Sequence, residues 1–292
     1  MSYRAIEQIL VTPIDRNPHV ERRDSGLPCR YCDEDDRSMF RQRAHAITEK
    51  LGNNVLISGD ECDTCNALIS KHESELVNFF GSSRTILGLP NKEKKPTSSD
   101  ASGKLRRKDR QISIMTSENP ITEMKRSADG SGRIEMMLPS ANYRPYQAFL
   151  ALQKCGLALM KRDMLERYRL VIDAILNRTE LPLHLTQVSS ATSNKGSTMF
   201  AAILHERSDQ DPADINVRHP RHVFSLFVGE TCLSIPVLDD TTVRHQIDRC
   251  TLNMKMSLQF PNGRLDYHKV KDFDWSSKEP TLSPFDRWAI TF

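Results

Sequence analysis

Two pairs of cysteines constrain the fold of this chain more than any other feature of its sequence. Cys29 and Cys32 form one C-x2-C knuckle, and Cys62 and Cys65 form a second one after a gap of 29 residues. Each knuckle can direct two thiolates at one ion, and four thiolates complete the tetrahedral coordination of structural zinc. The alternatives are two unrelated thiol pairs or a redox dithiol. The spacing therefore predicts a closed Zn²⁺ site that contributes to folding rather than to catalysis.

The composition places this zinc site in a globular protein. Of the 292 residues, 38% are hydrophobic and 27% are charged, which is typical of soluble domains. The chain contains no run of eighteen apolar residues, so no membrane span is predicted, and the first residues lack the apolar core of a signal peptide. We therefore expect a cytoplasmic protein. The other three cysteines stand in apolar patterns that predict buried thiols: Cys155, Cys232 and Cys250.

Positive charge is concentrated in the middle of the chain. The net charge is only +3, but residues 98–180 contain 15 Lys and Arg against 10 Asp and Glu. This balance excludes a generally basic nucleic-acid-binding surface and leaves the middle segment as a candidate patch. A basic cluster there predicts contacts to nucleic-acid phosphates, and its alternative is a solvated linker. The cluster consists of Lys104, Arg106, Arg107, Lys108 and Arg110.

The hydrophobic pattern predicts an α+β protein in three parts. Residues 1–97 hold the cysteine pairs, residues 98–110 are expected to form a basic linker, and residues 111–292 are expected to form an α+β domain of unknown role. Apolar residues recur at helical spacing from Tyr143 to Asn177, which predicts a helical pair with a break at Gly156 or at 161–163.

The rest of the C-terminal part shows the alternation of strands. Residues 121–138 predict a β-hairpin that turns at Asp129–Gly132. Further strands of a mostly antiparallel sheet are predicted at 111–118, 183–190, 197–206, 222–230, 231–238, 251–260 and 264–273. The chain contains no Walker loop, dinucleotide fingerprint or nucleophile elbow, so these enzyme classes are excluded.

The residues around the two knuckles resemble a known nuclease family. The segment AHAITEKLGNN lies between the knuckles, and ECDTCNALISKHESEL contains the second knuckle, followed at once by Asn66. Together with the first C-x2-C pair, these segments resemble the zinc-containing branch of the HNH endonuclease superfamily, the ββα-metal nucleases. The resemblance covers about residues 27–90 and implies a zinc-stapled ββα module at the N-terminus.

The resemblance implies hydrolysis of DNA phosphodiester bonds, and the sequence does not distinguish DNA from RNA as the substrate. His45 would be the general base, Asn54 would hold the loop that orients His45, and Asn66 would bind a catalytic Mg²⁺ or Mn²⁺ ion. One such site cuts one strand, so a double-strand break would need a homodimer or two nicks. The C-terminal part would bind DNA or a regulatory partner, and appended HNH modules imply a role in bacterial antiviral defence.

The sequence departs from the family at two positions that hold the catalytic ion. Ala44 stands where many members have an acidic ligand, and Ser70 stands one helical turn after Asn66, where a ligand is expected. Glu73 returns to the helical face of Asn66, and His72 is the other candidate ligand nearby. The alternative is therefore a catalytically inactive, zinc-stabilised module that binds nucleic acid or protein. In that case Asn66 would only cap its helix and His45 would be a core histidine.

Overall fold

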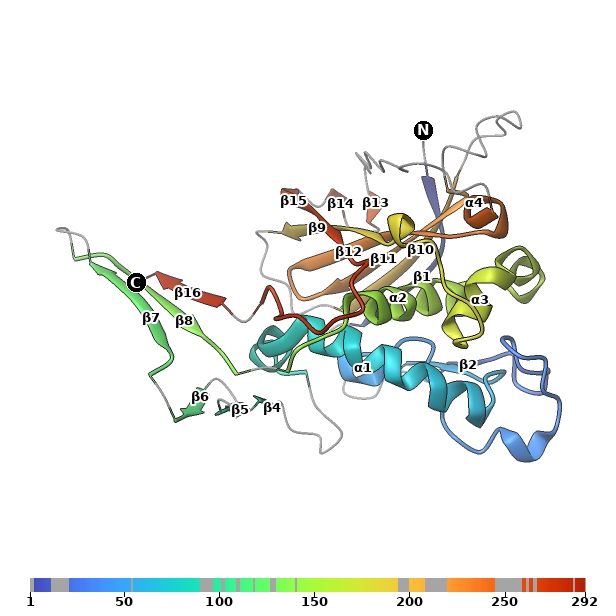
Figure 1. The fold of residues 1–292 in the computed structure, drawn as a ribbon, viewed down its shortest axis with the longest axis horizontal. Helices are drawn as coiled ribbons and strands as arrows, with labels where there is room; N and C mark the ends of the chain where they lie inside the picture. The colour runs from blue at the N-terminus through green and yellow to red at the C-terminus, as the bar shows by residue number, and fades with distance from the viewer. Residues whose placement is uncertain are drawn as a thin grey trace.

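A computed structural model gives the fold of the chain (Figure 1). It describes residues 3–11, 21–53, 55–89, 97–100, 103–108, 111–117, 119–126, 130–139, 141–193, 200–207, 220–244, 259–260, 263–264, 267–285 and 287–291.

A six-stranded antiparallel sheet forms one layer of the molecule. Its strand order is β1-β10-β11-β12-β9-β15. The strands in that order are Tyr3–Val11, Phe200–Arg207, His222–Val228, Thr231–Val237, Gln187–Ser193 and Tyr267–Asp274. Every residue of β11 is buried, so this central strand is covered on both of its faces. The predicted antiparallel sheet in the C-terminal part is confirmed.

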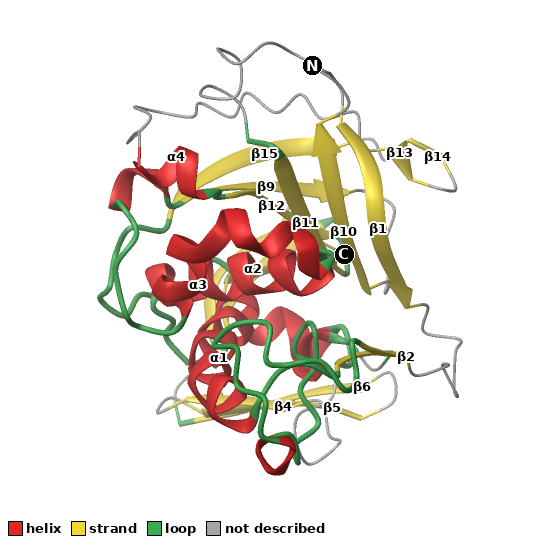
Figure 2. Ribbon diagram, turned by 90° about the vertical axis from the view of Figure 1, so that its right-hand side faces the viewer, coloured by secondary structure: helices red, strands yellow, loops and turns green. Residues whose placement is uncertain are grey.

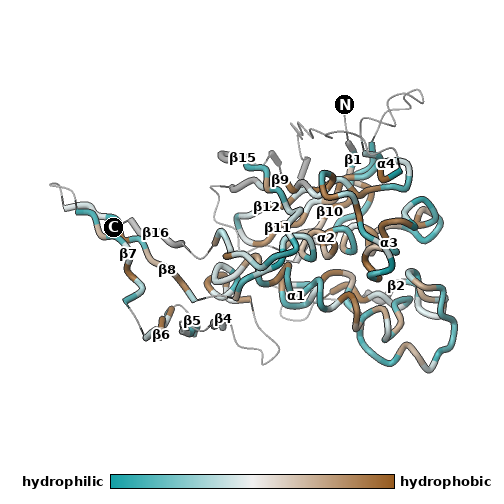
Figure 3. The backbone as a smooth tube through the Cα atoms, viewed as in Figure 1, coloured by the Kyte–Doolittle hydropathy of each residue, from teal (hydrophilic) through white to brown (hydrophobic). Residues whose placement is uncertain are grey.

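Helix α2, Pro145–Leu159, forms the middle layer between this sheet and the N-terminal part (Figure 2). Every residue of α2 except Gln147 is buried, as expected for a helix that is covered on all sides. Its apolar residues make α2 hydrophobic along much of its length, whereas surface strands such as β5 are hydrophilic (Figure 3). Beyond α2 the chain continues through η3, Arg162–Tyr168, and α3, Arg169–Ile175.

Gly156 shows why α2 is continuous where the sequence offered a break. The helix runs through Gly156 and ends at Leu159. A Cβ atom at position 156 would lie 2.8 Å from Val237 Cγ2 and 3.2 Å from Phe224 Cβ. The glycine therefore allows a close approach of helix and sheet, and the break falls at the other predicted place, just before η3.

Helix α1, Asp63–Ile86, lies on the opposite side of α2 and carries the N-terminal part (Figure 2). Gly81 takes non-helical dihedral angles inside it, so α1 is kinked there. Before α1 the chain forms β2, Glu21–Arg23, and β3, Leu56–Ser58, which pair in parallel. Three short 3₁₀ helices complete the described helical elements apart from α4, Asp240–Arg244; they are η1, Arg37–Met39, η2, Glu49–Leu51, and η4, Leu183–Leu185.

Two three-stranded sheets follow α1. The first has the order β4-β5-β6 and consists of Thr97–Asp100, Gly103–Lys108 and Gln111–Thr116. The second has the order β16-β8-β7, consists of Arg287–Thr291, Gly132–Met137 and Ile121–Arg126, and extends away from the body (Figure 1). The pairing of β7 with β8 confirms the predicted hairpin. A further pair joins β13, Gln259–Phe260, to β14, Gly263–Arg264.

The N- and C-terminal parts share one core, although the sequence divides them at residues 97 and 111. Strand β1 pairs with β10 at the edge of the C-terminal sheet, and residues of α1, α2 and the sheet belong to one hydrophobic cluster. The segment 98–110, predicted as a linker, contains most of β4 and all of β5. The predicted strand at 251–260 lies outside the described residues except for β13. Among the described helices, none combines the length and apolar character that a membrane span requires.

Candidate functional site

The four paired cysteines meet at the beginning of α1. Their sulfur atoms all lie within 4.8 Å of one another. Cys62 is the N-cap of α1 and its sulfur accepts a hydrogen bond from the Cys65 amide at 3.5 Å, while the Cys62 amide donates to the Cys29 sulfur at 3.5 Å. The first knuckle is closed by Asp33, whose positive φ of 61° lets its amide donate to the Cys29 carbonyl. The predicted cysteine cluster is therefore formed.

The geometry and chemistry of the cluster fit a zinc ion. Four sulfurs at about 2.3 Å from Zn²⁺ would stand about 3.8 Å apart, and the Cys32 and Cys62 sulfurs are 3.6 Å apart. Without a cation, the cluster stabilises the thiolate form of Cys29 but not that of Cys62. A hydrogen bond from Cys65 lowers the pKa of Cys29 to about 4, whereas burial, with the nearby Cys29 charge, raises the pKa of Cys62 to about 12. The site can thus hold a structural metal such as zinc, because a divalent cation would stabilise the additional thiolates.

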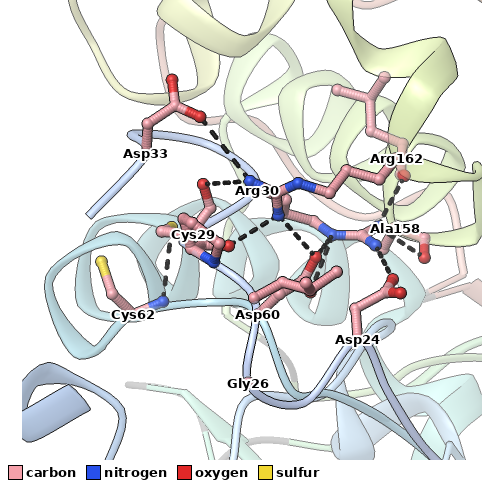
Figure 4. A network of polar contacts seen from close by, with 12 residues as sticks. Asp24, Gly26, Cys29, Arg30, Asp33, Asp60, Cys62, Ala158 and Arg162 are labelled. Carbon is pink, nitrogen blue, oxygen red and sulfur yellow. Dashed lines mark hydrogen bonds and ion pairs between the residues drawn. The ribbon is translucent and has the colours of Figure 1, made fainter. Parts of the chain in front are cut away.

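A buried arginine ties the first knuckle to α2 (Figure 4). Arg30 Nε donates to both carboxylate oxygens of Asp60 at 3.0 and 2.9 Å, and its two terminal nitrogens reach the carbonyls of Leu157 and Ala158 and the carboxylate of Asp24. The side chains of Arg30 and Asp60 are 1% and 0% exposed. The last turn of α2 therefore supplies part of the environment that holds the cysteine cluster in place.

His45 lies on a short antiparallel pairing that precedes α1. It forms a β-bridge with Ile57 of β3, and the connecting loop is held by the buried side chain of Asn53. Asn53 Nδ2 donates to the carbonyls of Ile47 and Leu56 at 2.8 and 2.9 Å, and its Oδ1 accepts from the Leu56 amide. The predicted loop-holding residue, Asn54, lies outside the described residues. Asn53 is the described asparagine that fixes this loop.

The imidazole of His45 is suited to accept a proton near neutral pH. Its side chain is 14% exposed, and Nε2 lies 3.7 Å from Glu49 Oε2 at the surface. Burial lowers the pKa of His45 from its ordinary value, although the nearby Glu49 carboxylate acts in the opposite direction. The ring is therefore neutral around pH 7, which is the form that a general base needs.

Lys154 of α2 connects His45 with Glu73. Its Nζ donates to the His45 carbonyl oxygen at 2.6 Å and to Glu73 Oε1 at 2.9 Å, and lies 3.5 Å from Glu61 Oε2. Burial alone would lower the pKa of Lys154, but the carboxylates of Glu61 and Glu73 outweigh it and raise that pKa well above the ordinary value. The ammonium group is therefore charged and pairs with the half-buried Glu73 carboxylate beside the His45 backbone, while burial raises the pKa of the neighbouring Glu61 to about 7.

Asn66 and His72, two of the other predicted ligands, have hydrogen-bond partners within the protein. Asn66 Nδ2 donates to Gln42 Oε1 at 3.0 Å, and since Cys62 caps α1, Asn66 is not the helix cap. His72 is buried, and its Nε2 lies 3.0 Å from the carbonyl of Ile175 in α3. Within the described residues, the four cysteines are the one group of three or more His, Cys, Asp and Glu side chains placed for a shared metal.

The basic cluster is divided between the two faces of β5. Lys104, Arg106 and Lys108 are exposed, and Arg107 is half-buried and donates to the Ile86 carbonyl at the end of α1. Arg110 lies outside the described residues.

Sequence patterns missed Arg30, Asn53, Glu61 and Lys154. Arg30 and Glu61 flank the cysteines, so their positions beside the metal site were visible, but nothing in the pattern marked them as buried ions. Lys154 stands in an apolar helix whose other residues predict full burial, and a charge at such a position was the available signal for a buried pair.

Comparisons of this chain with protein-family models, with curated proteins and with solved structures found no match.

Proposed function

We propose that this protein is a metal-dependent endonuclease that hydrolyses DNA phosphodiester bonds, with His45 as the general base. The observation that carries the proposal is the placement of His45. Its neutral, partly exposed imidazole belongs to a segment that pairs with β3, and the chain continues from β3 past the second cysteine pair into α1. This order of two paired segments and a helix agrees with the ββα module that the sequence resembles.

The chemistry follows from the protonation state of His45. The neutral ring accepts a proton from water, whose oxygen forms a bond to phosphorus while the bond from phosphorus to the 3′ oxygen breaks. The departing oxygen takes a proton from solvent. Lys154 and Asn53 hold the backbone at His45 and two residues after it, because Lys154 binds the His45 carbonyl and Asn53 binds the carbonyl of Ile47. These contacts fix the position of the base.

A divalent ion in such enzymes neutralises the phosphate and the departing oxygen. The described residues do not offer a preformed site for it: Glu73 Oε1 is paired with Lys154, and His72 faces the Ile175 carbonyl. We therefore assign no step to a divalent ion, and the dependence on Mg²⁺ or Mn²⁺ stays a prediction.

A plasmid-nicking experiment tests the proposal. The wild type, His45→Ala and His184→Ala are compared with Mg²⁺, with Mn²⁺ and without added metal, and the zinc content of each protein is measured. His184 is an exposed histidine on η4 and serves as the matched control. Nicking by the wild type and His184→Ala that is lost in His45→Ala supports the base. Nicking that persists in His45→Ala refutes it.

One observation favours a second function, a zinc-stabilised binding module without catalysis. The Lys154 ammonium already occupies the Glu73 carboxylate that a catalytic ion would need. In this case the wild type would bind nucleic acid or a protein partner, and it would not nick the plasmid with either metal although it retains its zinc. Nicking by the wild type would exclude this alternative.

A further inference from the structure

The sheet β4-β5-β6 separates the basic cluster into two sets with different surroundings. Along β5 the side chains alternate, so Leu105 and Arg107 share one face and Lys104, Arg106 and Lys108 share the other. Leu105 is fully buried, Arg107 donates to the Ile86 carbonyl, and Arg84 of α1 donates to the Thr97 carbonyl of β4. The first face therefore packs against α1, and we call the second one the outer face.

The strand register shows what surrounds the three cations of the outer face. Lys104 is paired with Ser99 and Met115, Arg106 with Thr97 and Ser113, and Lys108 with Gln111. Directly paired residues point to the same side of a sheet, so hydroxyl and amide groups and the Met115 thioether flank the cations. No acidic residue of the described part of the sheet is paired with one of them, which leaves the outer face positively charged.

Three exposed cations elsewhere in the protein are each paired with a carboxylate. Lys125 lies 2.8 Å from Glu123, Arg133 lies 2.8 Å from Glu135, and Arg178 lies 3.2 Å from Asp173. Within the described residues, Lys104, Arg106 and Lys108 have no such ion pair. Their charges are therefore available to a polyanion, whereas Lys125, Arg133 and Arg178 are compensated within the chain.

The spacing of the three cations suits a phosphodiester backbone. Alternate residues of a strand are about 6.7 Å apart, so Lys104 and Lys108 are separated by about 13 Å. One strand of a DNA duplex rises about 3.4 Å per nucleotide, so this length corresponds to about four nucleotides. Within the described strands, no aromatic side chain stands on the outer face to stack on a base, and hydroxyls and cations contact phosphates without reading sequence.

We propose that the outer face of β4-β5-β6 binds the phosphodiester backbone of nucleic acid through Lys104, Arg106 and Lys108, independently of sequence, while Arg107 anchors the sheet to α1. The choice of nucleic acid as the polyanion rests on the proposed function. Binding at this face does not require hydrolysis, so it can be measured without added divalent ions.

The test measures binding of a fluorescein-labelled 20-base-pair DNA duplex by anisotropy between 50 and 300 mM salt. Lys104→Gln/Arg106→Gln/Lys108→Gln is compared with the control Lys125→Gln/Arg133→Gln/Arg178→Gln, which loses the same charge from cations already paired with carboxylates. If each outer-face cation contacts one phosphate, the negative slope of log K against log salt is expected to become shallower by about 2.7 in the outer-face variant, at about 0.9 per phosphate. The control slope is expected to change by less than 1.

A charge-conserving variant, Lys104→Arg/Arg106→Lys/Lys108→Arg, shows whether charge rather than folding is responsible, and it is expected to keep the wild-type slope. An RNA duplex of the same sequence is expected to bind with the same dependence on the outer face, because its backbone has the same phosphodiester groups. Equal slopes in the outer-face and control variants would overturn the proposal. Equally tight binding of poly-glutamate by the outer face would also overturn it.

The two proposals fail in different ways. DNA binding that depends on the outer face, without nicking by the wild type, refutes the hydrolysis and leaves the binding face established. Nicking by the wild type with an unchanged salt slope in the outer-face variant refutes the binding face and leaves the hydrolysis intact.

Discussion

Replacing Arg30 with glutamine is expected to cost the protein about 4 kcal/mol of folding free energy. The substitution leaves the fully buried Asp60 carboxylate without its main partner, and it removes the donor that reaches the carbonyls of Leu157 and Ala158 at 3.0 Å each. Breaking a buried ion pair by removing one partner typically costs 3–5 kcal/mol. Arg162, whose guanidinium is 3.3 Å from Asp60, still neutralises part of the Asp60 charge in the variant, so we expect a cost in the middle of this range.

Urea unfolding of the zinc-loaded protein, followed by circular dichroism under reducing conditions, measures this cost. Arg178→Gln is the matched control, because its pair with Asp173 is 3.2 Å long but exposed, and surface pairs contribute about 0–1 kcal/mol. The double variant Arg30→Met/Asp60→Leu is expected to be more stable than Arg30→Gln, since no charge is left buried. A cost below 1 kcal/mol for Arg30→Gln would refute the role given to this network.

Two further predictions concern the metal and the pH dependence. The Cys62→Ser variant is expected to lose its zinc ion and most of its folded structure, whereas Cys232→Ser changes a buried thiol outside the cluster and is expected to retain the metal. Metal analysis and circular dichroism of both variants measure these effects. A full zinc content in Cys62→Ser would contradict the prediction. Burial lowers the pKa of His205 and of His222 to about 4, so between pH 6.5 and 4 the unfolded chain binds protons that the native protein does not. The free energy of unfolding is therefore expected to fall by about 3 kcal/mol per histidine as the pH decreases through this window. In His205→Leu, unfolding curves taken at each pH should show one proton fewer taken up on unfolding. An unchanged pH dependence of the unfolding free energy in His205→Leu would contradict the assignment.

The features that the sequence predicted well are those whose signal is local. Two C-x2-C pairs need only the short-range geometry of each knuckle and one common ion, and the four sulfurs do converge. The β7-β8 hairpin joins neighbouring segments through a glycine-containing turn, so alternation and turn residues were sufficient to predict it. The alternating segments from 197 to 238 likewise became β10, β11 and β12.

The features that the sequence did not predict depend on contacts between distant residues. Strand β1 finds its partner β10 about 200 residues later, and no local pattern identifies such a partner. Gly156 resembled a helix break because propensity disfavours glycine, but a close approach to Phe224 and Val237 explains it. The segment 98–110 looked like a linker because its charges mask the alternation of β5, in which only Leu105 is buried.

The candidate site was predicted only in part for the same reason. His45 was chosen for its place between the knuckles, and the sequence could not show that a lysine from α2, more than 100 residues away, would bind its carbonyl. Glu73 was chosen for its helical face, which does not reveal that Lys154 pairs with it. Composition alone does not indicate that Asn53, next to the predicted Asn54, holds the His45 loop through buried hydrogen bonds.

The position of Lys154 has a consequence for the order in which the chain is completed during translation. Glu61 and Glu73 leave the ribosome well before Lys154, the cation that lies beside both, since 80 residues separate Glu73 from Lys154. At synthesis rates of about 5–20 residues per second, this delay is about 4–16 s, and the partner of β1 follows later still. During this interval the knuckles can already bind a metal and Arg30 can already pair with Asp60, but Glu61 and Glu73 lack the Lys154 ammonium. A nascent chain that stops before α2 would therefore bind its metal without the contacts that α2 makes to this region, and proteases would cleave it more readily than the complete protein.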